Sequence, residues 1–157
     1  MPHKGELPAV QSDAQRAQAA KRQGVEPASI GACNVLTARE ASAALGATVT
    51  PQGHPICGYT AKAPDSLSKV GSIGVVALKA TPRVRDDLRT LTGPRPQRVT
   101  GPWEVAYIDR TTTGSLAYAT IALIKSETMV QISVSRPTAK GIADAVLKLG
   151  RAAAGRL

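Results

Sequence analysis

Two cysteines, Cys33 and Cys57, are the residues of this chain with the most distinctive chemistry. They are its only cysteines, and each lies next to a segment that the sequence predicts to be structured. One such pair is typical of a small exported domain closed by a disulfide, because disulfides persist in oxidising compartments. Two buried free thiols in a cytosolic protein are the alternative. A redox site is disfavoured, because the pair lacks the Cys-x-x-Cys spacing.

Metal binding and catalysis have little support in the residue pattern. A zinc site built from Cys33, His54 and Cys57 needs a fourth ligand, because structural zinc takes four. The other histidine, His3, lies in the polar N-terminal segment. We therefore expect no metal and no other cofactor.

The carboxylates and hydroxyls do not form a recognisable catalytic pattern either. The sequence contains no nucleophile elbow and no Gly-rich phosphate loop. Asp86 and Asp87 are adjacent on a predicted helix, where their side chains point about 100° apart and cannot converge on one bond. We predict that the protein is not an enzyme.

The chain is strongly basic, with a formal net charge of +9. This balance favours an anionic partner such as nucleic acid, anionic lipid or an acidic envelope polymer, and the alternative is that the charge serves solubility and a basic tail. Residues 83–98 are the most charged part of the predicted fold, and their arginines would either chelate a phosphate or carboxylate or form a solvated face. Nucleic acid is disfavoured, because the aromatic residues are not interleaved with these arginines as a stacking platform requires.

The elements that must position these residues follow from capping signals and hydrophobic periodicity. Residues 1–29 are predicted to be a disordered or frayed basic tail, and residues 30–157 a single α+β domain. Two helices are predicted to start at the caps Thr37 and Thr81, and a third helix is predicted from Thr138. No apolar run approaches the roughly 20 residues that cross a bilayer.

Five segments are predicted to be strands of an antiparallel sheet with helices packed on one face. They are residues 56–61, 73–80, 104–109, 116–124 and 129–135. Residues 111–114 are predicted to be a loop, and residues 125–127 a tight turn between the last two strands.

A one-sided sheet leaves its other face exposed or occupied, and this predicts a docking surface. On the last strand that face carries Gln131. Trp103 and Tyr107 lie on a strand that would line the rim, and Arg110 in the following loop would contact an anion. Aromatic residues and arginine often dominate binding energy, so we predict ligand binding at these four residues. The alternative for Trp103 is core packing, because it is the single largest apolar group of the chain.

Several sequence blocks together resemble a known family. They are residues 33–37 (Cys-Asn-Val-Leu-Thr), 40–46, 57–59 (Cys-Gly-Tyr) and 99–107, followed by an Ala-rich terminal helix. Over about residues 32–157 the chain resembles a family of small actinobacterial cell-envelope lipoproteins of unknown function. It departs from the family at residues 102–104, Pro-Trp-Glu, where a Gly-Asp step is more usual.

The resemblance implies export and binding, since similar extracytoplasmic domains are sensor modules of actinobacterial receptor kinases. We therefore expect a non-catalytic module of the cell envelope, with a Cys33–Cys57 disulfide, that recognises a small ligand or a partner protein, an anionic one included. The alternative is a cytosolic basic nucleic-acid-binding protein. Residues 30–33 match a lipoprotein cleavage box, but the residues before them are polar. We therefore expect any signal peptide or membrane anchor to lie outside this sequence.

Overall fold

One antiparallel sheet organises the part of the chain that the computed structural model describes, which is residues 26–52, 56–61 and 70–157. The helices are η1 (Ala32–Asn34, a 3-10 turn), α2 (Ala38–Leu45), α3 (Pro82–Asp86), α4 (Leu88–Thr92) and α5 (Ile142–Ala154). The strands are β1 (Val49–Gln52), β2 (Cys57–Ala61), β3 (Ser72–Lys79), β4 (Gln97–Arg98), β5 (Val105–Thr113), β6 (Leu116–Lys125) and β7 (Thr128–Arg136).

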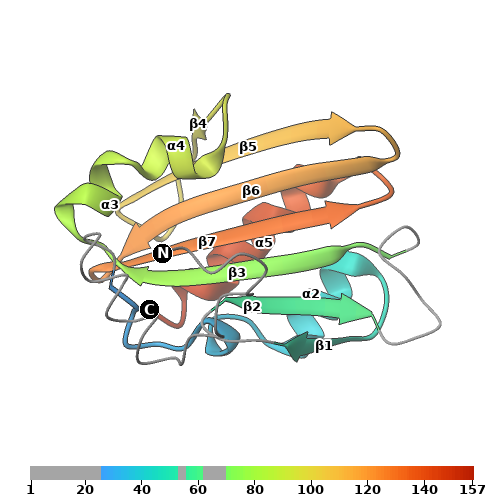
Figure 1. Cartoon of the computed structure of the whole chain (residues 1–157), viewed down its shortest axis with the longest axis horizontal. Coiled ribbons are helices and arrows are strands. Elements are labelled where there is room, and N and C mark those ends of the chain that lie inside the picture. The colour runs from blue at the N-terminus through green and yellow to red at the C-terminus, as the bar shows by residue number, and fades with distance from the viewer. Residues whose placement is uncertain (1–25, 53–55, 62–69) are drawn as a thin grey trace, which may run out of the picture.

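The seven strands lie in the order β1-β2-β3-β7-β6-β5-β4, and each neighbouring pair is antiparallel (Figure 1). The sheet consists of two groups of strands that are consecutive in sequence, β1–β3 and β4–β7. They meet where the whole length of β3 pairs with β7. The α+β class, the antiparallel sheet and the disulfide are confirmed, but the expected strand number of about five is wrong.

The two additional strands are short and rich in turn residues. β1 contains Pro51, and β4 comprises two residues that follow Pro94 and Pro96. Proline lacks the N–H donor of a strand ladder and is confined to sheet edges. Both strands are indeed the edges of the sheet, and this explains why their sequences resemble linkers.

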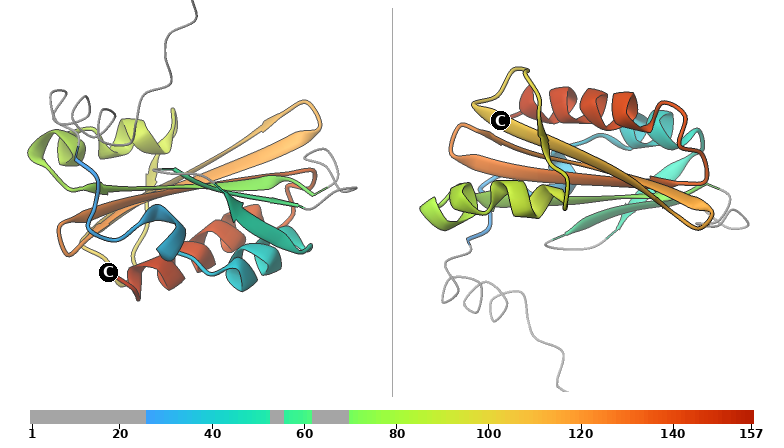
Figure 2. Two further views of the ribbon diagram at one scale, coloured as in Figure 1. Left: turned by 60° about the horizontal axis from the view of Figure 1, so that its bottom comes forward. Right: turned by 90° about the horizontal axis from the view of Figure 1, so that it is seen from above.

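The expectation that helices cover one face only is also wrong. α2 and α5 lie on one face of the sheet, whereas α3 and α4 lie on the other (Figure 2). The larger core fills the α2–α5 side and includes Ile121, Ile132 and Val146. A smaller core lies under α3 and α4, and its members are Ala80, Val84, Leu88, Ala122, Ile124 and Met129.

Several element boundaries differ from the prediction. The predicted second helix is divided at Asp87, which ends α3 and begins α4. The predicted loop at residues 111–114 belongs mostly to β5, which runs to Thr113. The last helix begins at Ile142 rather than after Thr138, because Gly141 before it has a positive φ of 70°.

The hairpin between β6 and β7 confirms the predicted tight turn. Lys125 pairs with Thr128, and the two residues between them, Ser126 and Glu127, have positive φ values of 51° and 63°. Positive φ at both central positions is the geometry of a type I′ turn, whose twist matches that of paired strands.

The helix α2 is capped as its sequence predicts. The Thr37 hydroxyl accepts a hydrogen bond from the Glu40 N–H at 3.1 Å, and the Glu40 carboxylate accepts one from the Thr37 N–H at 2.8 Å. Gly46 closes the helix in the left-handed conformation, at φ 72°. These bonds satisfy backbone donors that a helix start leaves unpaired.

The disulfide joins the start of the domain to the sheet. Cys33 in η1 and Cys57 at the start of β2 are bonded, with 5.0 Å between their Cα atoms. The buried Tyr59 strengthens the same connection, because its hydroxyl donates a hydrogen bond to the Leu36 carbonyl at 2.9 Å. η1 and the approach to α2 are therefore fixed against β2 by a covalent bond and a buried hydrogen bond.

The segment that precedes the first disulfide cysteine, residues 26–28, pairs with β3. Lys79 donates a backbone hydrogen bond to Glu26 at 2.8 Å, and Ala28 donates one to Ala77 at 3.2 Å. Residues 1–25 of the predicted tail lie outside the described residues.

The helix α5 approaches the sheet closely at Gly150. A Cβ atom at this position would lie 2.6 Å from Cδ1 of Ile121 in β6. Because no side chain separates helix and strand there, α5 packs directly on the centre of the sheet. The flank of α5 that faces α2 includes the small residues Ala145 and Ala152.

Candidate functional site

The four residues predicted to bind a ligand do not form one site. Alternate residues of a strand point to opposite faces, and in β5 this separates Tyr107 from Arg110. Tyr107 lies on the α3–α4 side, where it borders the smaller core. Arg110 borders a shallow pocket that also contacts Ala143 and Leu147 of α5, on the opposite face.

Tyr107 and Gln131 are brought together, since both pair with Ala122 of β6. Their polar and aromatic groups are nevertheless engaged within the molecule. The Gln131 amide donates a hydrogen bond to the Leu91 carbonyl, and the Arg89 guanidinium lies 5.6 Å from the centre of the Tyr107 ring. The predicted docking face is covered by α4 at this point.

Trp103 is half-buried against the larger core. Its indole N–H donates a hydrogen bond to the Val99 carbonyl at 3.1 Å, and its ring lies directly over Gly101. A shallow, open depression adjoins it, lined also by Lys125 and Ser126. Trp103 thus holds the corner before β5, and ligand binding at Trp103, Tyr107, Arg110 and Gln131 stays a prediction.

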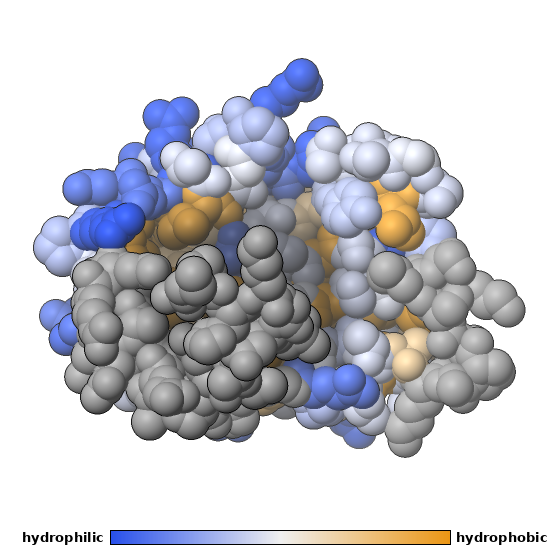
Figure 3. Space-filling model, in the orientation of Figure 1, coloured by the Kyte–Doolittle hydropathy of each residue, from blue (hydrophilic) through white to orange (hydrophobic). Residues whose placement is uncertain are grey.

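The arginine-rich segment forms contacts within the molecule. Arg85 forms an ion pair with Glu104 at 3.1 Å, Arg83 lies 4.0 Å from Asp87, and Arg89 stacks on Tyr107. Hydrophilic residues gather over this α3–α4 end of the molecule (Figure 3). These arginines are exposed cations with partners on the same surface.

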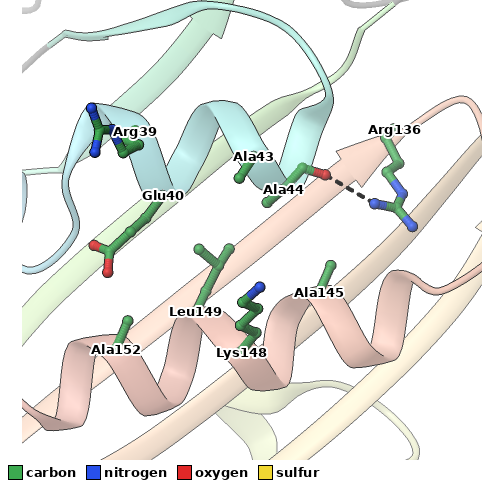
Figure 4. Close-up of a pocket in the computed structure, with 9 residues that line it drawn as sticks. All are labelled: Arg39, Glu40, Ala43, Ala44, Arg136, Ala145, Lys148, Leu149 and Ala152. Carbon is green, nitrogen blue, oxygen red and sulfur yellow. Dashed lines mark hydrogen bonds between the residues drawn. The ribbon is translucent and has the colours of Figure 1, made fainter.

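A groove between α2 and α5 is a second candidate site, with a more apolar lining than the pocket beside Arg110 (Figure 4). It has a volume of about 340 Å³, which lies within the range of roughly 300–1,000 Å³ typical of small-molecule pockets. Its lining residues are Arg39, Glu40, Ala43 and Ala44 of α2, Arg136 of β7, and Ala145, Lys148, Leu149 and Ala152 of α5.

Helical periodicity places the apolar part of this lining. Ala145, Leu149 and Ala152 recur at spacings of four and three residues and therefore share one face of α5. Ala43 and Ala44 face them from α2, as Figure 4 shows. Four of these five residues are alanines, whose small side chains do not fill the space between the two helices. The groove therefore stays open.

Charged groups border the apolar floor. The Lys148 side chain is exposed and points across the groove toward α2, while Arg136 lies beside the end of α2 (Figure 4). The Arg136 guanidinium donates hydrogen bonds to the carbonyls of Ala44 at 2.9 Å, Thr138 at 3.0 Å and Lys140. Three backbone acceptors therefore fix the position of this cation.

Glu40 is the one carboxylate among the described lining residues, and its charge is already matched. It forms an ion pair with Arg156 at 2.7 Å and accepts the Thr37 N–H. Burial raises the pKa of Glu40, but the hydrogen bonds from Thr37 and the charge of Arg156 outweigh it, and the pKa lies below its ordinary value. Glu40 is therefore an anion at neutral pH with its charge directed at Arg156.

Tyr59 is the other described residue whose pKa is shifted. Burial, followed by the charge of Glu40, raises the pKa of its phenol above the ordinary value. The hydroxyl therefore stays protonated and keeps its structural hydrogen bond to Leu36. Neither shifted group is arranged as an acid or base toward the groove.

The sequence contained a weak signal for this groove. Lys148 stands on the predicted polar side of the last helix, and alanines replace the larger apolar residues expected where two helices face each other. The position of Arg136 could not be inferred, because it depends on how α2 and β7 meet in space.

Comparisons with known proteins found no match to this chain among family models, curated proteins or solved structures. No group of His, Cys, Asp and Glu in the described part of the chain is arranged to hold a metal ion. Both histidines, including the considered zinc ligand His54, lie outside the described residues. No described helix has the length and apolar character needed to cross a bilayer.

Proposed function

We propose that the protein is a non-catalytic extracytoplasmic binding or sensor module of the cell envelope, and that the α2–α5 groove is its ligand site. The observation that carries this proposal is the groove itself, a pocket with an apolar floor between two helices docked on one sheet. The described residues of its lining include no hydroxyl, thiol or imidazole that could act as a nucleophile or a histidine base.

The disulfide supports the extracytoplasmic location in this proposal. Disulfides persist in secreted and envelope proteins and are rare in the reducing cytosol. The Cys33–Cys57 bond joins two elements of the larger core, η1 and β2, so it belongs to the architecture of the domain.

Binding at the groove is tested by thermal unfolding with a panel of small envelope components, including carboxylates, amines, sugars and short peptides. A molecule that binds only the folded state raises the Tm according to its concentration and affinity. We expect at least one class to raise the Tm of the native protein. Ala145→Leu should abolish that rise, because the added side chain fills the groove.

Ala38→Leu is the matched control, since Ala38 is exposed on α2 outside the groove. An equal loss of the Tm rise in both variants would contradict a site between the helices, as would a panel without effect. DNA and RNA titrations over a salt series test the nucleic-acid alternative. Tight binding with a steep salt slope would replace the envelope proposal, since such a slope reports phosphate neutralisation.

A further inference from the structure

We propose that the groove takes a free, single-chain carboxylate with an apolar tail of medium length. This inference rests on the proposed function, because it names the ligand class of the same site. It follows from three features of the lining: its uncompensated charge, the fixed geometry of Arg136 and the shape of the apolar floor.

The first feature is charge. Arg39, Arg136 and Lys148 line the groove, and none of them forms an ion pair with a carboxylate among the described residues. Glu40, the single acid among the described lining residues, pairs with Arg156. Three cations thus border a groove in whose described lining the single anion, Glu40, is already paired, and this charge is complementary to an anionic ligand.

The second feature is the guanidinium of Arg136. Of its five N–H donors, three are given to the carbonyls of Ala44, Thr138 and Lys140. Two donors remain without an acceptor among the described residues. A carboxylate offers two oxygens to such a pair, and the three backbone bonds already hold the cation in place, so little side-chain freedom is lost on binding.

The third feature is the floor. Leu149 is buried at its base, and Ala43, Ala44, Ala145 and Ala152 form its sides. A volume of about 340 Å³ is at the lower end of the small-molecule range, so it accommodates one alkyl chain more readily than a two-chain lipid. The cations at the border and the apolar floor together select an amphiphile whose head is negative.

The test is a titration of the 15N-labelled protein with sodium octanoate below its micelle concentration, followed by amide chemical shifts. We expect saturable shifts at groove residues. Sodium butanoate should bind at least about tenfold more weakly, because each buried methylene contributes up to about fourfold in affinity. Octylammonium, which has the same chain and the opposite charge, should cause no saturable shift at these residues.

A pair of α5 variants separates a contact at the groove from a general effect of charge. Lys148→Gln should raise the Kd for octanoate about fivefold, the scale of one partly exposed ion pair. Arg151→Gln removes an equal charge from an exposed position of the same helix outside the lining and should leave the Kd within about twofold. Equal effects of the two variants would overturn the proposal.

The titration also distinguishes failure of this inference from failure of the proposed function. If octanoate causes no saturable shift but another molecule of the thermal panel perturbs the groove residues, the ligand class is wrong and the binding module remains. If no probe perturbs them, both proposals fall. Binding to anionic phospholipid vesicles without binding to free octanoate would overturn the carboxylate ligand in favour of a membrane surface.

Discussion

Glu40 and Arg156 connect two parts of the chain that are far apart in sequence. The Arg156 guanidinium pairs with Glu40 at 2.7 Å and donates hydrogen bonds to the carbonyls of Val35 and Ala152. Glu40 also completes the capping box with Thr37. One carboxylate therefore fixes the start of α2 and the end of α5 at the same time.

The lowered pKa of Glu40 predicts the pH dependence of stability at this contact. A carboxyl whose folded pKa lies below its unfolded value stabilises the fold above the unfolded pKa, which is near the ordinary 4.5. That contribution is lost as the pH falls from there through the folded pKa. Glu40→Gln should lower the free energy of unfolding by about 1 kcal/mol at pH 7.

Chemical denaturation of the native protein and Glu40→Gln at several pH values measures this difference. It should shrink as the pH is lowered through the acidic range. Asp86→Asn is the control, because Asp86 is exposed on α3 and forms no ion pair with a described residue. A difference between the native protein and Glu40→Gln that does not depend on pH would contradict the assignment.

Among the elements, α3 and α4 are where the structure departs most from expectation. They cover the sheet face opposite α2 and α5, with Leu88 buried against Ala122 and Ile124 in the smaller core. Their polar side contains the arginines that pair with Glu104 and stack on Tyr107. This pair of helices occupies part of the face that was predicted to be free.

Docking of these helices is tested by truncating their buried residue. Leu88→Ala should lower the free energy of unfolding by about 2–4 kcal/mol, because Leu88 is 2% exposed and its removal leaves a cavity. Leu91→Ala is the matched control. Leu91 is only partly buried, so we expect a loss of about 1 kcal/mol. Equal losses, measured by denaturant unfolding, would show that α3 and α4 do not pack as described.

Local signals explain which elements could be predicted from the sequence. The capping box at Thr37 and Glu40 and the alternation in β7 specify their elements within a few residues, so α2 and β7 were expected close to their observed positions. The helix break at Asp87 and the strand at Pro51 oppose local propensity and depend on tertiary contacts. Where local propensity and tertiary contacts disagree, the tertiary contacts determine the secondary structure.

The candidate site was harder to predict from the sequence than the elements were, for the same reason. The sequence predicts Lys148 only as part of a polar helix face, and Arg136 is the last residue of β7, just beyond the predicted strand. Only the three-dimensional arrangement places both beside α2. Proximity in sequence suggests a common site for Trp103, Tyr107 and Arg110, but strand alternation places Tyr107 on the sheet face opposite Arg110.

For the whole molecule, the disulfide bears on both the cellular compartment and the free energy of unfolding. It closes a loop between residues 24 positions apart, and the chain-entropy model assigns such a loop about 3–4 kcal/mol. Reduction should therefore lower the free energy of unfolding by about that amount. The domain should still fold when reduced, because the larger core extends well beyond the loop.

Thiol titration and denaturant unfolding measure the two parts of this prediction. The unfolded, unreduced protein should contain no titratable thiol, and the reduced protein should contain two. A Cys33→Ser/Cys57→Ser variant should have the stability of the reduced protein. Two free thiols in protein recovered from an oxidising compartment would contradict both the bond and the exported-domain proposal.

The position of β3 in the sheet has a consequence for the order of folding. β1, β2 and β3 are neighbours in sequence, as are β4 to β7, but Ser72 of β3 meets Ser135 of β7 across 63 positions. Loop-closure entropy delays such long-range pairing relative to local hairpins. In a chain that emerges N-terminus first, the disulfide loop would therefore be complete before β7 is available. Until then the edge of β3 that pairs with β7 is free, and its residues Ile73 and Val75 are apolar. We therefore expect the protein to be most prone to aggregation during this interval.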